Sequence, residues 1–138
     1  MSEPTTKKSV TRTGQCFCGA VKYTVTGDPI NVRACHCKDC QRLTGSAFFA
    51  RALFPKAQVT ITGQVAEFPS NDDVIRKFCP RCGSQLFVDR KSRPDAISIS
   101  LGSFDNLDGI LVPEHIWVSD KQAWYSIPAG TKQHRQTP

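Results

Sequence analysis

The sequence has no long hydrophobic run, since no stretch approaches the roughly 20 consecutive apolar residues that a helix needs to cross a bilayer. It also has no window of a dozen residues with a helical period of hydrophobicity, no repeat at a fixed spacing and no low-complexity segment. Behind the charges of Met1–Lys8 there is no apolar stretch, so we expect no signal peptide. These absences predict a soluble protein of the reducing cytoplasm that has no membrane partner.

Short β-strands account for most of the pattern that is present. Residues 20–26 alternate strictly, with Val21, Tyr23 and Val25 on one face. Further strands are predicted at 59–62, 65–68, 74–78, 84–88 and 97–101. The pair Gly63-Gln64 predicts a tight hairpin that joins the first two of these strands.

Helical pattern is confined to one fragment. Residues 38–44 could form one or two turns that end at Gly45. The sequence therefore predicts an all-β fold, and its 138 residues fit one domain. The polar ends, residues 1–13 and 129–138, are expected to be frayed tails.

The formal net charge of +6 treats each of the seven cysteines as a neutral thiol. If all seven bound two Zn²⁺ as thiolates, four positive and seven negative charges would be added, and the net charge would fall to about +3. The basic composition is therefore weak evidence for a nucleic-acid partner, and it suits a small anionic ligand equally well.

The cysteines come in three groups. Cys16 and Cys18 form the first, Cys35, Cys37 and Cys40 the second, and the knuckle Cys79-Pro80-Arg81-Cys82-Gly83 the third. An odd number of thiols cannot be used up by disulfides, and closely spaced cysteines in a cytosolic protein more often bind metal. The knuckle is the most specific local signal, because its tight turn lets two sulfurs converge.

Two partitions of these thiols are open. The knuckle could join Cys37 and Cys40 in a zinc ribbon, which the spacing alone slightly favours. It could instead join Cys16 and Cys18 in a closed four-ligand site. The ribbon leaves three thiols in two places without evident use, whereas the second partition divides seven into four and three. Four protein ligands are typical of a structural zinc, and three with an open position are typical of a reactive one.

Several stretches, in order along the chain, resemble one known family. They are Gly14–Val21, Cys35–Arg42 with Thr44–Ser46, Phe78–Gly83, His115–Val118 and Trp124. Together they resemble the glutathione-dependent formaldehyde-activating enzyme family, which shares its domain with centromere protein V, over residues 14–128. The resemblance implies a single domain with a compact β-tent fold of short antiparallel strands around two zinc ions. It also implies the four-plus-three partition, with a structural zinc at Cys16, Cys18, Cys79 and Cys82 and a catalytic zinc at Cys35, Cys37 and Cys40.

A zinc ion with three thiolate ligands has a formal charge of −1 and is a poor electrophile for activating water. It suits an incoming thiol, which loses its proton on coordination although the pKa of a free thiol is about 8.5. The resemblance implies that this thiol is glutathione and that its sulfur adds to formaldehyde to give S-hydroxymethylglutathione. The reverse is a carbon–sulfur lyase reaction, so we expect an enzyme whose partners are a small thiol and formaldehyde.

A proton donor for the nascent hydroxyl group is not evident. His36 lies between two cysteines that would point at the metal, so an extended segment turns it away. Asp39 is more typical of a solvated surface carboxylate. Ser46 follows a short turn that could fold it back toward the cysteines, although a purely structural turn residue is the simpler interpretation.

Near the C-terminus, His115 and Trp117 alternate with two apolar residues on an expected strand. Trp117 and Trp124 are more typical of core anchors than of ligand platforms. His134 lies in the expected tail, where it would be solvated.

Glutathione has two carboxylates, so its site should offer cations. Lys38, Arg42 and Arg51 are closest in sequence to the open site, and each singly is also typical of a solubilising surface charge. The chief alternative to an enzyme is a zinc-stabilised binding module, for glutathione or for nucleic acid or chromatin. Against nucleic acid, the basic residues are dispersed and no run of aromatic residues alternates with them.

Overall fold

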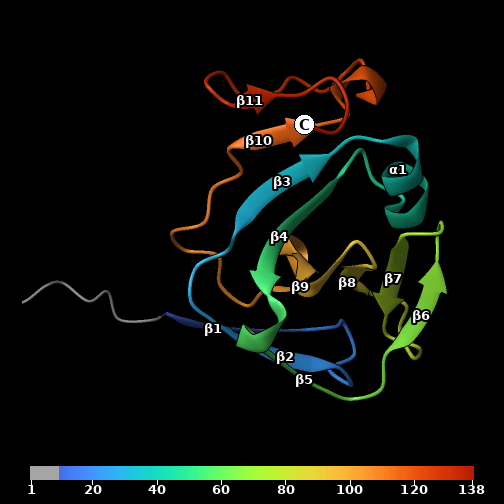
Figure 1. Cartoon of the computed structure of the whole chain (residues 1–138), viewed down its shortest axis with the longest axis vertical. Coiled ribbons are helices and arrows are strands. Elements are labelled where there is room, and N and C mark those ends of the chain that lie inside the picture. The colour runs from blue at the N-terminus through green and yellow to red at the C-terminus, as the bar shows by residue number, and fades with distance from the viewer. Residues whose placement is uncertain (1–9) are drawn as a thin grey trace, which may run out of the picture.

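The computed structural model describes residues 10–138, and this part of the chain is mostly β with one α-helix, as predicted (Figure 1). A small antiparallel sheet has the order β1-β2-β5, with β1 at Thr11–Gln15, β2 at Lys22–Thr26 and β5 at Val59–Thr62. Tyr23 and Val25 of β2 are buried, because alternate side chains of a strand point to opposite faces.

A larger sheet of eight strands occupies the rest of the fold in the order β11-β10-β3-β4-β9-β8-β7-β6. In this order the strands are Lys132–Gln133, Glu114–Ile116, Asn31–Cys35, Phe49–Pro55, Arg93–Ser100, Gln85–Arg90, Val74–Phe78 and Ala66–Pro69. In Figure 1, β3 runs from the region of the small sheet toward the end where α1, β10 and β11 lie, and β4 runs back beside it. The large sheet therefore connects the two ends of the molecule.

The two faces of the large sheet carry different apolar clusters. The main core packs Tyr23 of the small sheet against Phe54 of β4 and Phe87 of β8, and the Tyr23 and Phe87 rings meet edge to face at 5.4 Å. A smaller cluster on the other face includes Phe49, Val88 and two cysteines. Because successive residues of β4 point to opposite faces, Phe49 and Phe54 belong to different clusters.

The helix α1 (Lys38–Thr44) lies where the sequence predicts it. Gly45 ends it in a left-handed conformation, with φ of 65°, and its N–H donates to the carbonyl of Gln41 at 2.8 Å. Three short 3₁₀ helices, at Lys56–Gln58, Leu101–Ser103 and Val118–Asp120, complete the helical content of the described chain. Within residues 10–138, no helix has both the length and the apolar character to cross a membrane.

The predicted hairpin at Gly63 is wrong. β5 pairs with β2 and β6 pairs with β7, so the strands on either side of Gly63 belong to different sheets. The φ of Gly63 is 99°, and a Cβ atom there would lie 2.2 Å from the carbonyl oxygen of Ala20. Glycine is therefore required at this position by a crossing between sheets and not by a two-residue turn.

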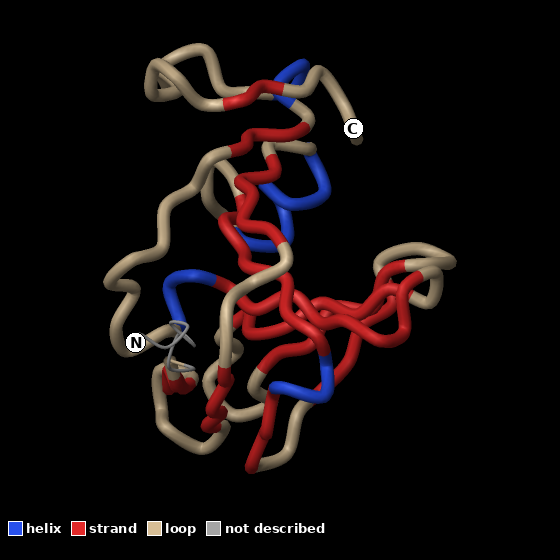
Figure 2. Tube along the Cα trace, turned by 60° about the vertical axis from the view of Figure 1, so that its left-hand side comes forward, coloured by secondary structure: helices blue, strands red, loops and turns tan. Residues whose placement is uncertain are grey.

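Two further expectations need correction. The strands are not all antiparallel, because β10 runs parallel to both β3 and β11. Residues 129–138 are not a frayed tail, since they contain β11 and hydrogen-bond to β10 and to the residues that follow it, as in the 2.9 Å bond from the His134 N–H to the His115 carbonyl. Figure 2 shows this segment at one end of the molecule, where β11 forms the edge of the large sheet. Residues 11–13, also expected to fray, belong to β1, and residues 1–9 lie outside the described residues.

Candidate metal centres

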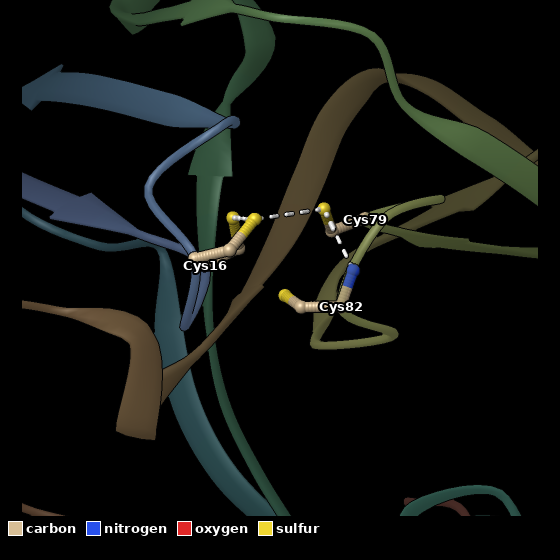
Figure 3. A group of neighbouring side chains, drawn as sticks. Cys16, Cys79 and Cys82 are labelled. Atoms are coloured by element: carbon tan, nitrogen blue, oxygen red, sulfur yellow. Dashed lines mark hydrogen bonds between the residues drawn. The ribbon is translucent and has the colours of Figure 1, made fainter.

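Four cysteines meet where the β1–β2 loop approaches the β7–β8 turn, and we call them the four-cysteine cluster: Cys16, Cys18, Cys79 and Cys82. Glycine closes both turns, since the N–H of Gly19 donates to the Cys16 carbonyl at 3.1 Å and that of Gly83 to the Cys79 carbonyl at 2.9 Å. Both glycines have a φ of 81°, a conformation that other residues adopt only at a cost. Figure 3 shows that the sulfurs of Cys16, Cys79 and Cys82 face a common point.

The spacing of these sulfurs fits a tetrahedral metal. Zinc–sulfur bonds of about 2.3 Å place neighbouring sulfurs roughly 3.8 Å apart. Cys16 Sγ and Cys18 Sγ are 3.6 Å apart, and Cys18 Sγ and Cys79 Sγ are 3.8 Å apart, which excludes disulfides. The backbone N–H groups of Val21 and Arg81 each donate to a sulfur, of Cys16 and Cys79 respectively, at 3.3 Å. Such donors stabilise thiolates, the form that binds metal.

The other three thiols, Cys35, Cys37 and Cys40, form the three-cysteine cluster, in which all sulfurs lie within 4.8 Å of one another. Cys35 is the last residue of β3, Cys37 is the N-cap of α1, and Cys40 lies in its first turn. The Cys40 N–H donates to Cys37 Sγ at 3.3 Å. Because Cys79 and Cys82 belong to the other cluster, a zinc ribbon that combines them with Cys37 and Cys40 is excluded.

Arg76 of β7 joins the three-cysteine cluster from 36 residues further along the chain. Its Nη2 donates to Cys40 Sγ at 3.5 Å, and its side chain is only 7% exposed, with the guanidinium over the Phe49 ring. Hydrogen bonds with Cys35 and Cys37, and then the Arg76 guanidinium, lower the pKa of the Cys40 thiol to about 3. Hydrogen bonding with Cys37 raises the pKa of the Cys35 thiol. Cys40 is therefore the first of the three thiols to become negatively charged.

A cavity of about 30 Å³ lies beside Cys35 and Cys40, and Arg51 and Arg76 also line it. This volume is about the space of one water molecule in the liquid. The three thiols thus have room beside them for one further donor atom, such as a sulfur. The four-cysteine cluster already offers the four ligands of a closed zinc site, so the two clusters differ in the number of thiols that they offer a metal.

His36 turns away from the cysteines on either side of it, as the alternation of an extended segment predicts. It is completely buried, its Nε2 lies 2.8 Å from Nδ1 of His115, and its ring packs beside Phe48 and Tyr125. Burial lowers the pKa of His36 to about 4 and also lowers the pKa of His115. Both imidazoles are therefore uncharged at neutral pH.

The remaining polar candidates divide clearly. Arg51 lines the cavity beside the three-cysteine cluster, whereas Lys38, Asp39 and Arg42 are exposed on α1. Ser46 is exposed, and its N–H donates to Thr44 Oγ1 at 3.2 Å, which fits the simpler interpretation of a structural turn residue.

Three C-terminal candidates also take different places. Trp117 is half-buried and packs against the smaller apolar cluster. Trp124 is 73% exposed, so the expectation that it anchors the core is wrong; its ring meets that of Tyr125 edge to face at 6.1 Å. His134 is not simply solvated, since its Nε2 lies 3.2 Å from Glu114 Oε1 across the β10–β11 pair.

Three comparisons place the chain among known proteins. A family model described as "Glutathione-dependent formaldehyde-activating enzyme" matches residues 11–120. A crystal structure of a Rhodobacter sphaeroides protein from structural genomics has a TM-score of 0.55 and 22% sequence identity, with 72% of this chain and 90% of that chain covered. This likeness shows the fold alone. A search of curated proteins found no match to the chain.

Proposed function

Because the chain belongs to the glutathione-dependent formaldehyde-activating enzyme family, we propose that it is a zinc-dependent carbon–sulfur lyase that forms or cleaves S-hydroxymethylglutathione. In the forward direction a sulfur–carbon bond forms between the glutathione thiol and formaldehyde, and the thiol proton ends on the new hydroxyl group. The reverse releases both molecules. No electrons are gained or lost, so the reaction needs no oxidant or reductant.

We assign the two cysteine clusters different roles within one β-tent domain at residues 14–128. Cys16, Cys18, Cys79 and Cys82 would hold a structural zinc, and Cys35, Cys37 and Cys40 would hold the catalytic one. When bound at the second centre, Zn²⁺ supplies the positive charge that keeps an incoming thiol deprotonated at neutral pH. The seven thiols stay free for this use in a reducing compartment, which the cytoplasm provides.

The side chains around the three-cysteine cluster prepare it for a fourth sulfur. Arg76 donates to Cys40 Sγ, so it stabilises the thiolate form of that ligand. Phe49 and Ile116 pack against the same cluster and limit the access of water. The cavity beside Cys35 and Cys40 is small enough to select one donor atom and orient it. This cavity, next to three converging thiols, is the observation that carries the proposal.

Calorimetric titration of the zinc-loaded protein tests the proposed thiol site. Glutathione should bind, and S-methylglutathione should bind at least tenfold more weakly, because its methylated sulfur cannot become a thiolate. Native mass spectrometry of the same sample should show two zinc ions per chain. One zinc ion with three alkylatable thiols, or equal affinity for the two ligands, would refute the assigned roles.

A second measurement separates catalysis from mere binding, because small thiols add to formaldehyde unaided. Exchange between glutathione and S-hydroxymethylglutathione, followed by NMR, should be faster with the protein than without it. Cys35→Ser should abolish the acceleration while the four-cysteine cluster keeps its zinc. Binding of glutathione without any acceleration would instead identify a zinc-stabilised carrier module.

A further inference from the structure

One face of the large sheet carries a row of arginines in register with the three-cysteine cluster. Arg33 of β3 is paired with Arg51 of β4, two residues before Cys35 on the same strand. Arg76 is paired with Val88 across β7 and β8, and Arg90 lies two residues after Val88. Side chains directly opposite each other share a face, as do residues two apart on one strand. The sheet therefore gathers these cations around the cysteines.

A second cavity lies among these arginines. Its volume is about 140 Å³, and its polar lining consists of Asn31, Arg33, Arg51, Arg90, Arg93 and Ser98. Arg51, Arg90 and Ser98 also line the 30 Å³ cavity beside Cys35 and Cys40. The two cavities thus share walls, and one elongated molecule could place one end in each. We call the larger one the arginine cavity.

The positive charge of this region is only partly compensated by the protein. Arg33 pairs with Glu114 at 3.3 Å and Arg90 with Asp73 at 3.5 Å. Within residues 10–138, no carboxylate lies within ion-pair distance of Arg51, and its guanidinium donates instead to the neutral side-chain oxygen of Asn31.

Burial, and then the neighbouring charges of Arg33 and Arg90, lower the pKa of Arg51 to about 10. Arg51 nevertheless keeps its charge at neutral pH, and a charge in this position is costly without a partner. The Cys35 and Cys40 thiolates offset part of this cost, and no carboxylate of residues 10–138 pairs with Arg51, so a bound anion would relieve the remaining repulsion among the three guanidiniums.

We propose that the thiol that enters the three-cysteine cluster carries a carboxylate, and that the arginine cavity binds this carboxylate through Arg51, with Arg33, Arg90 and Arg93 around it. This inference rests on the proposed function and adds to it the residues that recognise a carboxylate of the thiol substrate. A guanidinium binds a carboxylate through two parallel hydrogen bonds, a geometry that a lysine cannot provide.

The size of the arginine cavity limits what it recognises. A volume of about 140 Å³ holds the equivalent of four or five liquid water molecules, enough for a carboxylate and the carbons next to it. The remainder of a molecule as large as glutathione would stay outside. The cavity therefore recognises a carboxylated arm, and simpler mercapto acids should also bind.

The test compares two small thiols on the zinc-loaded protein, 3-mercaptopropionate and 2-mercaptoethanol, which differ mainly in the carboxylate. Calorimetric titration gives the dissociation constant of each for the wild type, for Arg51→Met and for Arg135→Met, an exposed arginine outside both cavities. We expect Arg51→Met to raise the dissociation constant of 3-mercaptopropionate by about 10- to 100-fold, which is the effect of losing hydrogen bonds to a charged group. The dissociation constant of 2-mercaptoethanol should stay unchanged. Arg135→Met should change neither.

The outcomes separate this inference from the proposed function. If both thiols bind and Arg51→Met affects them equally, the carboxylate site is wrong while the thiol site stands. If glutathione binds and neither small thiol does, the inference fails while the proposed function stands; if glutathione does not bind either, both fail. Should Arg51→Met not fold, Arg93→Met replaces it, because Arg93 is exposed at the start of β9 and lines the same cavity. If Arg93→Met then weakened the binding of 3-mercaptopropionate by less than about threefold, the inference would be overturned.

Discussion

We expect Cys79→Ser to unfold the domain under conditions where Cys35→Ser remains folded. The two clusters tie the chain together over very different distances. In the four-cysteine cluster, Cys18 and Cys79 are 61 residues apart, whereas Cys35 and Cys40 are five apart. The entropic cost of closing a loop grows with the logarithm of its length. Because of the longer loop alone, the four-cysteine cluster should therefore contribute about 2 kcal/mol more to the free energy of unfolding than the three-cysteine cluster.

The contribution of the metal widens this difference. A structural zinc can contribute an apparent binding free energy of about 10–16 kcal/mol, compared with roughly 5–15 kcal/mol for the stability of a whole domain. Cys79 is completely buried and Cys16 nearly so, so loss of this zinc also leaves unpaired thiols between the two sheets. We therefore expect the Tm of Cys79→Ser to lie at least about 10 °C below that of Cys35→Ser.

Circular dichroism of both variants on heating measures this difference, and native mass spectrometry reports their zinc content. Cys35→Ser should retain one zinc ion and a cooperative transition, and a chelator strong enough to remove that ion should then unfold it. Equal melting temperatures for the two variants would contradict the assignment of a structural role to one cluster and a reactive role to the other.

The remaining predictions concern single side chains. Arg76→Gln should weaken glutathione binding by about tenfold without changing the zinc content, since a charged donor to Cys40 Sγ is lost, and Arg76→Lys should restore much of the affinity; calorimetry measures both, and unchanged binding in Arg76→Gln would refute this role. Gly14→Ala should lower the free energy of unfolding by about 3 kcal/mol, because its Cβ would lie 2.2 Å from Tyr23 Oη, whereas Gly102→Ala, with no atom within 4 Å of its Cβ, should have little effect. Urea denaturation checks this pair, and similar midpoints would contradict it.

Local chemistry was predictable wherever it depends on neighbours in the sequence. The tight turn of Cys79–Gly83 and the helix Lys38–Thr44 with its cap at Gly45 follow from residues that lie within a few positions of one another. The alternation of Val21, Tyr23 and Val25 likewise placed the core face of β2 correctly, because the period of a strand is a local property.

Strand pairing was less predictable, because it depends on which distant edges are free. The strands on either side of Gly63 belong to different sheets, because β5 pairs with β2 and β6 pairs with β7. No local pattern in the sequence identifies these partners. The contact between Arg76 and the three-cysteine cluster was likewise not predictable from the local sequence. An arginine between Val74 and Phe78 stands on the buried face of an alternating strand, which signals a buried partner, but the sequence does not say that the partner is Cys40.

The sequence by itself determined that seven thiols form metal-type motifs and that, by their resemblance to a known family, they divide into four and three. These properties reside in short spacings and tight turns, which each segment encodes alone. Only the tertiary structure decided that Cys79 and Cys82 face Cys16 and Cys18, and that arginines from three strands line the cavity beside the three-cysteine cluster. Side chains from distant strands meet only through the register of the sheet, and that register is set by the packing of the whole chain.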